Sequence, residues 1–171
     1  MTRALVLIGA PGAGKSAVLD AIGTRLEAEG VEHGAIESEE LARGFPVLAN
    51  ALLIEQLGAV LAVQRRAGRR LFMLAFTAES AAELREVRAV AAAEEAMVVC
   101  LRASAEVLAA RLREREPDLW PGKAALIAHA RSLASQVPEL DGVDLTLDTD
   151  GRAAEDVAVE VCRAMRERAI L

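Results

Sequence analysis

The first 29 residues contain an apolar segment, a glycine-rich loop and a helical pattern in direct succession. Residues 5–8 are apolar, residues 9–16 read Gly-Ala-Pro-Gly-Ala-Gly-Lys-Ser, and residues 17–29 have the pattern of an amphipathic helix. The loop matches the pattern Gly-x-x-x-x-Gly-Lys-Ser/Thr in full. Its glycines let the backbone curl so that several N–H groups face one point, and the following helix adds the positive end of its dipole. This order of elements predicts a phosphate-binding loop at the end of a buried strand.

We expect this phosphate-binding loop (residues 9–16) to hold the phosphates of a nucleotide. Lys15 supplies a positive charge for the outer phosphates, and the Ser16 hydroxyl can ligate Mg²⁺. The chain has 18 arginines but two lysines, and a compact ammonium group suits this position better than a guanidinium. The candidate nucleotide-binding residues here are Gly9, Ala10, Pro11, Gly12, Ala13, Gly14, Lys15, Ser16 and Ala17. The alternative is a glycine-rich turn that binds no ligand.

Size and charge exclude several classes of protein. With 171 residues and 53% hydrophobic content, we expect a single domain, 1–171, with a full core. A net charge of −6 argues against a dedicated nucleic-acid partner, and no apolar run is long enough to cross a membrane. Cys100 and Cys162 lie in apolar patterns, so we expect buried thiols in a reducing cytoplasm.

Apolar segments alternate with helical patterns along the chain. Strands are expected at 3–8, 33–37, 71–76, 96–101 and 143–147. Helices are expected at 17–29, 38–43, 47–67, after Ser80, and at 104–115, 123–136 and 152–168. This alternation predicts an α/β fold with a parallel sheet that has helices on both faces.

Glutamates follow the second expected strand. Ligands bind beyond the carboxyl ends of parallel strands, so Glu37 and Glu39 should lie within reach of the phosphate-binding loop. We expect Glu37 to hold Mg²⁺ together with Ser16, and Glu39 to accept a proton from a substrate hydroxyl. The alternative is that Glu39 and Glu40 only place acids in the first turn of a helix, where they are favoured.

Arg111 and Arg115 lie four residues apart and therefore on one face of a helix. A pair of guanidinium groups over a transferring phosphoryl group would stabilise its charge, and Arg111 could also contact the nucleotide. We expect the segment from about 111 to 123 to act as a lid that excludes water. The alternative is a solvated face of arginines and glutamates.

Two further segments are candidates for ligand contacts. Asp150 and Gly151 follow the last strand, where they could lie along a nucleotide base or form a turn and helix cap. The region from about 38 to 67 is the expected acceptor-binding segment. It carries no recognisable substrate signature.

With these motifs, the chain resembles the P-loop kinases of the shikimate, gluconate and nucleotide kinase group. The resemblance is carried by residues 9–16, 36–41, 98–115 and 145–151. It implies the three-layer P-loop NTPase fold, a five-stranded sheet of order 2-3-1-4-5, and ATP and Mg²⁺ as cofactors. The chain departs from the group where Glu37 and Glu39 replace two aspartates, and where residues 76–79 replace a run of three glycines.

We therefore expect an ATP-dependent kinase that acts on a small-molecule hydroxyl or phosphate acceptor. Its catalytic residues would be Lys15, Glu37, Glu39, Arg111 and Arg115. Two alternatives stay open: a nucleotide-binding regulatory module or slow NTPase without a small acceptor, and a protein that only binds nucleotide. The sequence does not identify the acceptor, the preference for ATP over GTP, or the oligomeric state.

Overall fold

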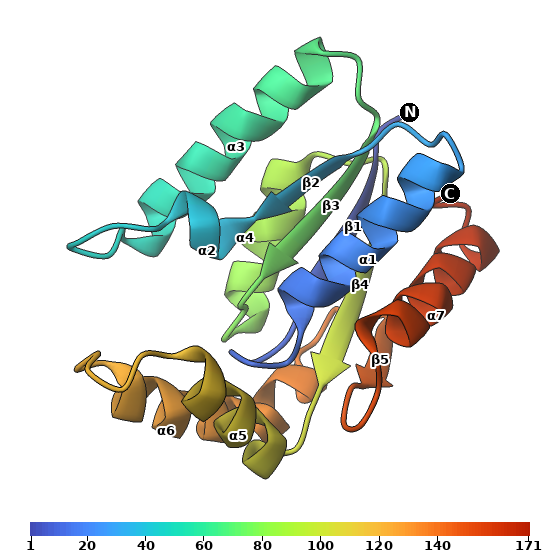
Figure 1. Cartoon of the computed structure of the whole chain (residues 1–171). Helices are drawn as coiled ribbons and strands as arrows, with labels where there is room; N and C mark the ends of the chain where they lie inside the picture. The colour runs from blue at the N-terminus through green and yellow to red at the C-terminus, as the bar shows by residue number, and fades with distance from the viewer.

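The computed structural model describes residues 1–171 and contains one five-stranded sheet (Figure 1). The strands are β1 (Arg3–Ile8), β2 (Gly34–Glu37), β3 (Leu71–Phe76), β4 (Glu95–Arg102) and β5 (Leu145–Asp148). All neighbouring strands are parallel, and their order is β2-β3-β1-β4-β5. The predicted fold class and strand order are confirmed.

The three central strands are buried along their length because helices cover both faces of the sheet. Every residue of β3 is buried, as are five of the six residues of β1. The strands pair in level register, so that Ile8 stands opposite Phe76 on one side and Cys100 on the other. Their carboxyl ends therefore form one edge, from which the loops that follow all begin.

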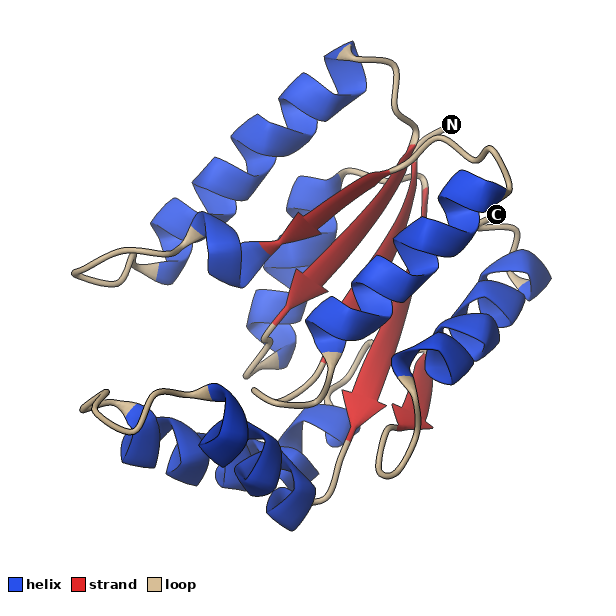
Figure 2. Cartoon of the chain, in the orientation of Figure 1, coloured by secondary structure: helices blue, strands red, loops and turns tan.

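The helices form two layers and one separate pair (Figure 2). One face of the sheet carries α1 (Lys15–Ala28) and α7 (Ala154–Glu167), which contact each other. The other face carries α3 (Asn50–Arg66) and α4 (Ala81–Ala91), and the short α2 (Ser38–Leu41) contacts α3. A pair formed by α5 (Ala105–Arg115) and α6 (Lys123–Gln136) lies at the carboxyl ends of the strands, and a 3₁₀ turn, Val137–Glu139, follows it.

Local sequence sets where the helices begin and end. Gly30, with a φ of 71°, ends the first helix in the left-handed conformation that favours glycine. The Ser80 hydroxyl accepts a hydrogen bond from the Glu83 N–H at 3.2 Å, as expected for the first turn of α4. The helix expected over 47–67 begins only at Asn50, because Ala49 before it is extended at ψ 145°. The segment 47–49 is consequently an exposed loop.

The two cysteines are free and buried, as predicted. Burial raises the pKa of the Cys100 thiol to about 11. No helix of the structure is long and apolar enough to span a bilayer.

Candidate functional site

The phosphate-binding loop leaves β1 and enters α1 as a tight curl. Gly12 and Gly14 have φ values of 85° and 97°, in the left-handed region that favours glycine. A Cβ on Gly12 would lie 3.2 Å from the Leu108 carbonyl oxygen, so α5 packs closely against the loop. The helix starts at Lys15, and its first N–H groups therefore point into the curl.

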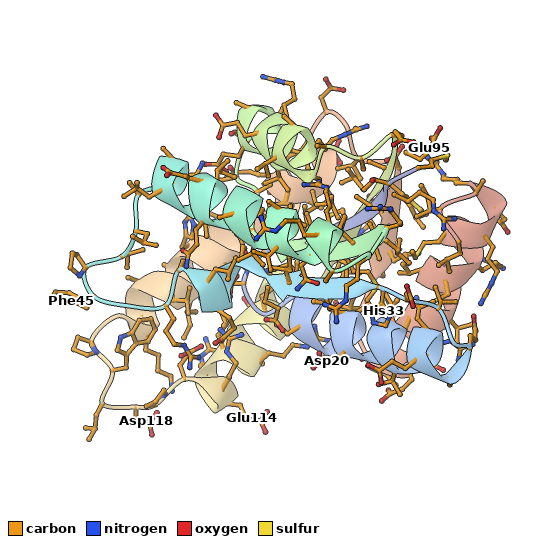
Figure 3. The ribbon with its side chains drawn as sticks, turned by 90° about the horizontal axis from the view of Figure 1, so that it is seen from above. Asp20, His33, Phe45, Glu95, Glu114 and Asp118 are labelled. Carbon is orange, nitrogen blue, oxygen red and sulfur yellow. The ribbon has the colours of Figure 1, made fainter.

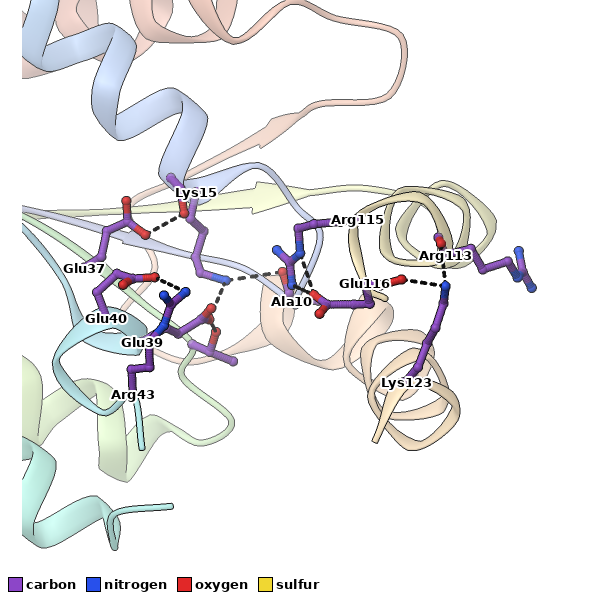
Figure 4. A network of polar contacts seen from close by, with 12 residues as sticks. Ala10, Lys15, Glu37, Glu39, Glu40, Arg43, Arg113, Arg115, Glu116 and Lys123 are labelled. Atoms are coloured by element: carbon purple, nitrogen blue, oxygen red, sulfur yellow. Dashed lines mark hydrogen bonds and ion pairs between the residues drawn. The ribbon is translucent and has the colours of Figure 1, made fainter. Parts of the chain in front are cut away.

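Lys15 lies at the bottom of the site, with 7% of its side chain exposed. Its ammonium group donates hydrogen bonds to the carbonyl oxygens of Gly9, at 3.0 Å, and Ala10, at 3.4 Å. It also forms an ion pair with Glu39 at 3.5 Å (Figure 4). Burial lowers the pKa of Lys15, and the Glu39 carboxylate opposes that change. A buried ammonium at the base of a cavity is well suited to bind an anion that replaces these partners.

Glu39 enters the site from α2 and has a second partner. The Thr77 hydroxyl, just past β3, donates a hydrogen bond to the same carboxylate oxygen, Oε1, at 2.8 Å. Although burial acts to raise the pKa of Glu39, the Lys15 charge and the Thr77 hydrogen bond hold it below its ordinary value. The carboxylate is therefore charged and fixed in orientation beside the ammonium.

Ser16 and Glu37 lie together on the opposite side of Lys15. The Ser16 hydroxyl donates a hydrogen bond to Glu37 Oε2 at 2.7 Å. A hydroxyl and a carboxylate oxygen are both ligands that Mg²⁺ accepts, and this cation usually takes its other ligands from phosphates and water. The pair fits that donor set. No cluster of three or more His, Cys, Asp or Glu side chains offers a cage made of protein alone.

A cavity of about 380 Å³ opens above the loop. It brings together most of the side chains that the sequence singled out, from the loop, from α2 and from α5. Its lining residues include Gly12, Gly14, Lys15, Ser16, Ala17, Glu39, Arg111 and Arg115. Glu114 and Leu112 complete the wall on the side of α5. The other loop residues, 9–11 and 13, lie beneath the surface of this cavity or beside it.

Arg111 and Arg115 both line the cavity, but their guanidinium groups have different partners. Arg111 donates to the carbonyl oxygen of Gly12 at 3.1 Å and to that of Thr149 at 2.8 Å. Arg115 instead pairs with Glu116 at 2.6 Å. Arg111 is thus fixed against the back of the phosphate-binding loop, whereas Arg115 is paired with its neighbour Glu116, whose side chain is 19% exposed.

A second hollow of about 280 Å³ adjoins the loop on the side of α7. Arg111, Thr149, Arg152, Ala154 and Val157 line it with residues of the loop and of α1. Neither Asp150 nor Gly151 lines this hollow, and that they lie along a nucleotide base stays a prediction. The Asp150 carboxylate instead accepts a hydrogen bond from the Ser104 N–H at 3.1 Å. Nor do they cap α7, whose N-cap is Ala153 without a side-chain hydrogen bond.

Thr149 and Arg152 line this hollow and flank Asp150 and Gly151, the two residues of this turn that the sequence analysis selects as candidates. Thr149 is buried, and its hydroxyl donates towards the Ala13 carbonyl oxygen at 3.1 Å. It therefore ties the end of the last strand to the phosphate-binding loop. A polar residue directly after a buried strand was the available signal, but the sequence does not show which neighbour points inward.

Lys123 is the one lysine in the segment that we expect to act as a lid (residues 111–123, the lid segment), and it binds the end of α5. Lys123 donates hydrogen bonds of 2.7 Å to the carbonyl oxygens of Arg113 and Glu116 (Figure 4). It donates another to the Asp118 carboxylate. Two of these acceptors lie at the end of α5, where backbone carbonyls lack helical partners. Because they flank Arg115, Lys123 fixes the stretch of backbone that carries that arginine.

Replacing Lys123 by methionine is expected to lower the melting temperature by about 3–12 °C. The expected net loss is about 1.5–3 kcal/mol, the contribution of one hydrogen bond to a charged group, and each kcal/mol corresponds to about 2–4 °C for a chain of this size. Limited proteolysis should then cut within 116–122 sooner than in the wild type. Lys123→Arg serves as the control and should recover part of both losses. Equal cleavage rates in wild type and Lys123→Met would contradict this role.

Comparisons with known proteins place the chain in a family. A family model described as an AAA domain, AAA_33, matches residues 5–136. No curated protein matches the chain. Among solved structures, the chain is similar to the Mycobacterium tuberculosis APS kinase in complex with AMPPNP and APS, with a TM-score of 0.70 and 20% identity over 96% of this chain and 98% of that chain.

Two other solved structures are similar over nearly their whole length. The shikimate kinase from Acinetobacter baumannii in complex with shikimate has a TM-score of 0.63 and 17% identity, over 98% of this chain and 94% of that chain. A gluconokinase from Sinorhizobium meliloti 1021 has a TM-score of 0.62 and 21% identity, over 95% of both chains. The chain therefore belongs to the AAA_33 family of AAA domains and has the fold of the small-molecule P-loop kinases.

Proposed function

We propose that this protein is an ATP-dependent kinase that transfers the γ-phosphoryl group to a small-molecule acceptor. One observation carries the proposal: an ammonium, a hydroxyl and a fixed carboxylate, from Lys15, Ser16 and Glu39, line a single cavity above the phosphate-binding loop. A phosphoryl transfer needs a cation for the phosphates, a ligand for Mg²⁺ and a group that orients the acceptor hydroxyl. The cavity offers all three.

The nucleotide would lie across the two hollows that adjoin the loop. Its β- and γ-phosphates would be held by the loop N–H groups and by Lys15 in the larger one. Its base would enter the smaller one, between Arg111, Arg152 and the apolar side chains of α7. A guanidinium plane beside an apolar wall suits a flat aromatic ring.

Ser16 and Glu37 are the residues that would hold Mg²⁺ together with the phosphates. The cation would neutralise charge that develops on the transferring group. Arg115 would add to this stabilisation if the lid segment brings it over the phosphates, since its partner Glu116 is the only contact that it must leave.

A third hollow, the acceptor hollow, has a volume of about 240 Å³ and lies between α2, α3, α4 and the end of β3. Glu39 also lines the cavity above the phosphate-binding loop, the phosphate cavity. An acceptor bound in the acceptor hollow would therefore present its hydroxyl beside that carboxylate. The hydroxyl oxygen forms the new bond to the γ-phosphorus, while the bond from phosphorus to the β–γ bridging oxygen breaks and its electron pair leaves with ADP. The hydroxyl proton passes to Glu39.

Nucleotide binding would also prepare Glu39 for this task. In the structure Lys15 is shared between the loop carbonyls and Glu39. A γ-phosphate would draw the ammonium away from the carboxylate and remove the main charge that keeps the pKa of Glu39 low. The carboxylate then becomes a better proton acceptor once the phosphoryl donor is in place.

The first test is nucleotide binding followed by acceptor-dependent turnover. Calorimetry should show that AMPPNP binds with Mg²⁺ and binds more weakly when Ser16 is replaced by alanine. ATP consumption should then rise when a suitable acceptor is added. Consumption that no acceptor stimulates would favour a regulatory NTPase, and no binding of AMPPNP would overturn the proposal. The two buried free thiols are compatible with the cytoplasmic location that a kinase using cellular ATP would have.

A further inference from the structure

The acceptor hollow carries a charge pattern that limits what it can bind. Three carboxylates line it, from Glu39, Glu79 and Glu83, and no lysine or arginine does. Asn50 supplies the remaining long polar side chain. An acceptor that carries a carboxylate or phosphate group needs a guanidinium or ammonium partner in such a site, and here it would instead meet three like charges.

The basic side chains near the hollow are already engaged with other groups. Arg43, which follows the lining residue Ala42, pairs with Glu40 at 3.0 Å, and its side chain is 78% exposed. His129 from α6 contacts Glu79 Oε1 at 2.7 Å. Lys15 faces the loop carbonyls and would bind the nucleotide phosphates. None of these leaves a free positive charge for an anionic acceptor.

The carboxylates are held in place, and each keeps one oxygen free. Glu79 uses Oε1 for His129, and Glu83 uses Oε2 to accept a hydrogen bond from the Glu79 N–H at 2.8 Å. Glu39 uses Oε1 for both Thr77 and Lys15. The second oxygen of each carboxylate accepts no hydrogen bond from the protein. Fixed acceptors of this kind lose little conformational entropy when they bind a donor.

Most of the remaining lining of the hollow is apolar. Val47, Leu48, Leu53 and Phe76 line it, and Val47 has 78% of its surface exposed. Beyond them, Phe45 is fully exposed at the tip of the loop between α2 and α3. Figure 3 shows Phe45 on the same side of the molecule as Asp118 of the lid segment, and Figure 1 shows both loops projecting to that side. Exposed apolar side chains around a cavity indicate a surface that a ligand covers.

We propose that the acceptor is a cationic amino alcohol: a small molecule with a protonated amine, a hydroxyl group and an apolar face. This inference rests on the proposed kinase function and names the substrate class of the same site. The amine would donate to the free oxygens of Glu79 and Glu83, and the apolar face would pack on Leu53 and Phe76. The hydroxyl would then lie at Glu39, beside the γ-phosphate.

The test uses wild-type protein with Mg²⁺ and ATP, and a panel of acceptors in matched pairs. Each pair shares a carbon skeleton and differs in charge, such as glucosamine against glucuronate, and aliphatic or aromatic amino alcohols against the corresponding hydroxy acids. We expect phosphorylation of amine-bearing members and none of the acids. In Glu79→Gln and Glu83→Gln the KM for the amine should rise about tenfold to a hundredfold, while the KM for ATP stays constant.

Glu40→Gln is the matched control, because Glu40 carries the same charge on the same helix as Glu39 but does not line the hollow. It should leave both KM values unchanged. Phosphorylation of acids in preference to amines overturns the substrate class, and so does a panel without any substrate when AMPPNP still binds. Failure to bind AMPPNP overturns the kinase proposal itself, so the two failures are distinguishable.

Discussion

Replacing Lys15 by alanine is expected to abolish measurable nucleotide binding, with Kd for AMPPNP raised by at least about a hundredfold. The ammonium is the one cation buried beneath the phosphate cavity, and charged hydrogen bonds contribute about 1.5–3 kcal/mol each. Transfer should fall further still, by about a thousandfold, because the charge on the transferring group would lose its nearest counterion. Calorimetry and single-turnover kinetics measure the two losses.

The matched variant is Lys15→Arg, which retains the charge. Lys15 has 7% of its side chain exposed and reaches two loop carbonyls, so a planar guanidinium does not fit without displacing the loop. We expect this variant to bind nucleotide almost as poorly as Lys15→Ala. Lys15→Ala and Lys15→Arg should both fold. Burial lowers the pKa of Lys15, so the charged ammonium itself costs free energy in the folded state and is not needed for folding. Wild-type affinity in either variant would contradict the site.

Replacing Glu39 by glutamine is expected to lower kcat by about a hundredfold to ten-thousandfold, the range found for a positioned proton acceptor. Nucleotide affinity should be preserved or slightly increased, because the change releases Lys15 from its 3.5 Å ion pair. The amide can still accept the Thr77 hydrogen bond, so the side chain keeps its place. Steady-state kinetics with saturating acceptor, together with AMPPNP titration, separate the two effects.

Glu40→Gln again provides the comparison, since Glu40 is paired with Arg43 and lies outside the cavity. Its kcat should equal that of the wild type. If Glu39→Gln transfers phosphate at the wild-type rate, the carboxylate is not the proton acceptor. If it loses nucleotide binding as well, Glu39 has a structural role in the loop and not a role in the transfer.

Features that are local in the sequence could be predicted. The loop at 9–16 is contiguous in the sequence. Its glycines and the apolar strand before it are enough to predict a tight curl of the backbone at the end of that strand. Fully buried strands such as β3 read as unbroken apolar runs, so their bounds were also correct. The order of the strands came from the resemblance to P-loop kinases, because hydrophobic patterns alone do not say which strands are neighbours.

Features that depend on tertiary contacts could not be read in advance. Thr149 and Asp150 both follow the last strand, and the sequence does not distinguish their roles. In the structure the Thr149 hydroxyl donates to the Ala13 carbonyl oxygen, whereas the Asp150 carboxylate accepts from the Ser104 N–H. Spacing places Arg111 and Arg115 on one face of α5. It does not reveal that Arg111 is bound to Gly12 and Thr149. The acceptor hollow is lined by residues of four elements, and no single segment of the sequence predicts it.

The carboxyl ends of β3, β1 and β4 have a consequence for how such a chain can diverge. The three strands end at the same edge of the sheet, β4 two residues beyond the other two, and the segments that would touch a ligand follow that edge. Replacement of residues 44–49 or 116–122 would leave the paired strands and their covering helices undisturbed. Mutations there could therefore exchange one acceptor for another while the folded scaffold and the loop at 9–16 stay intact.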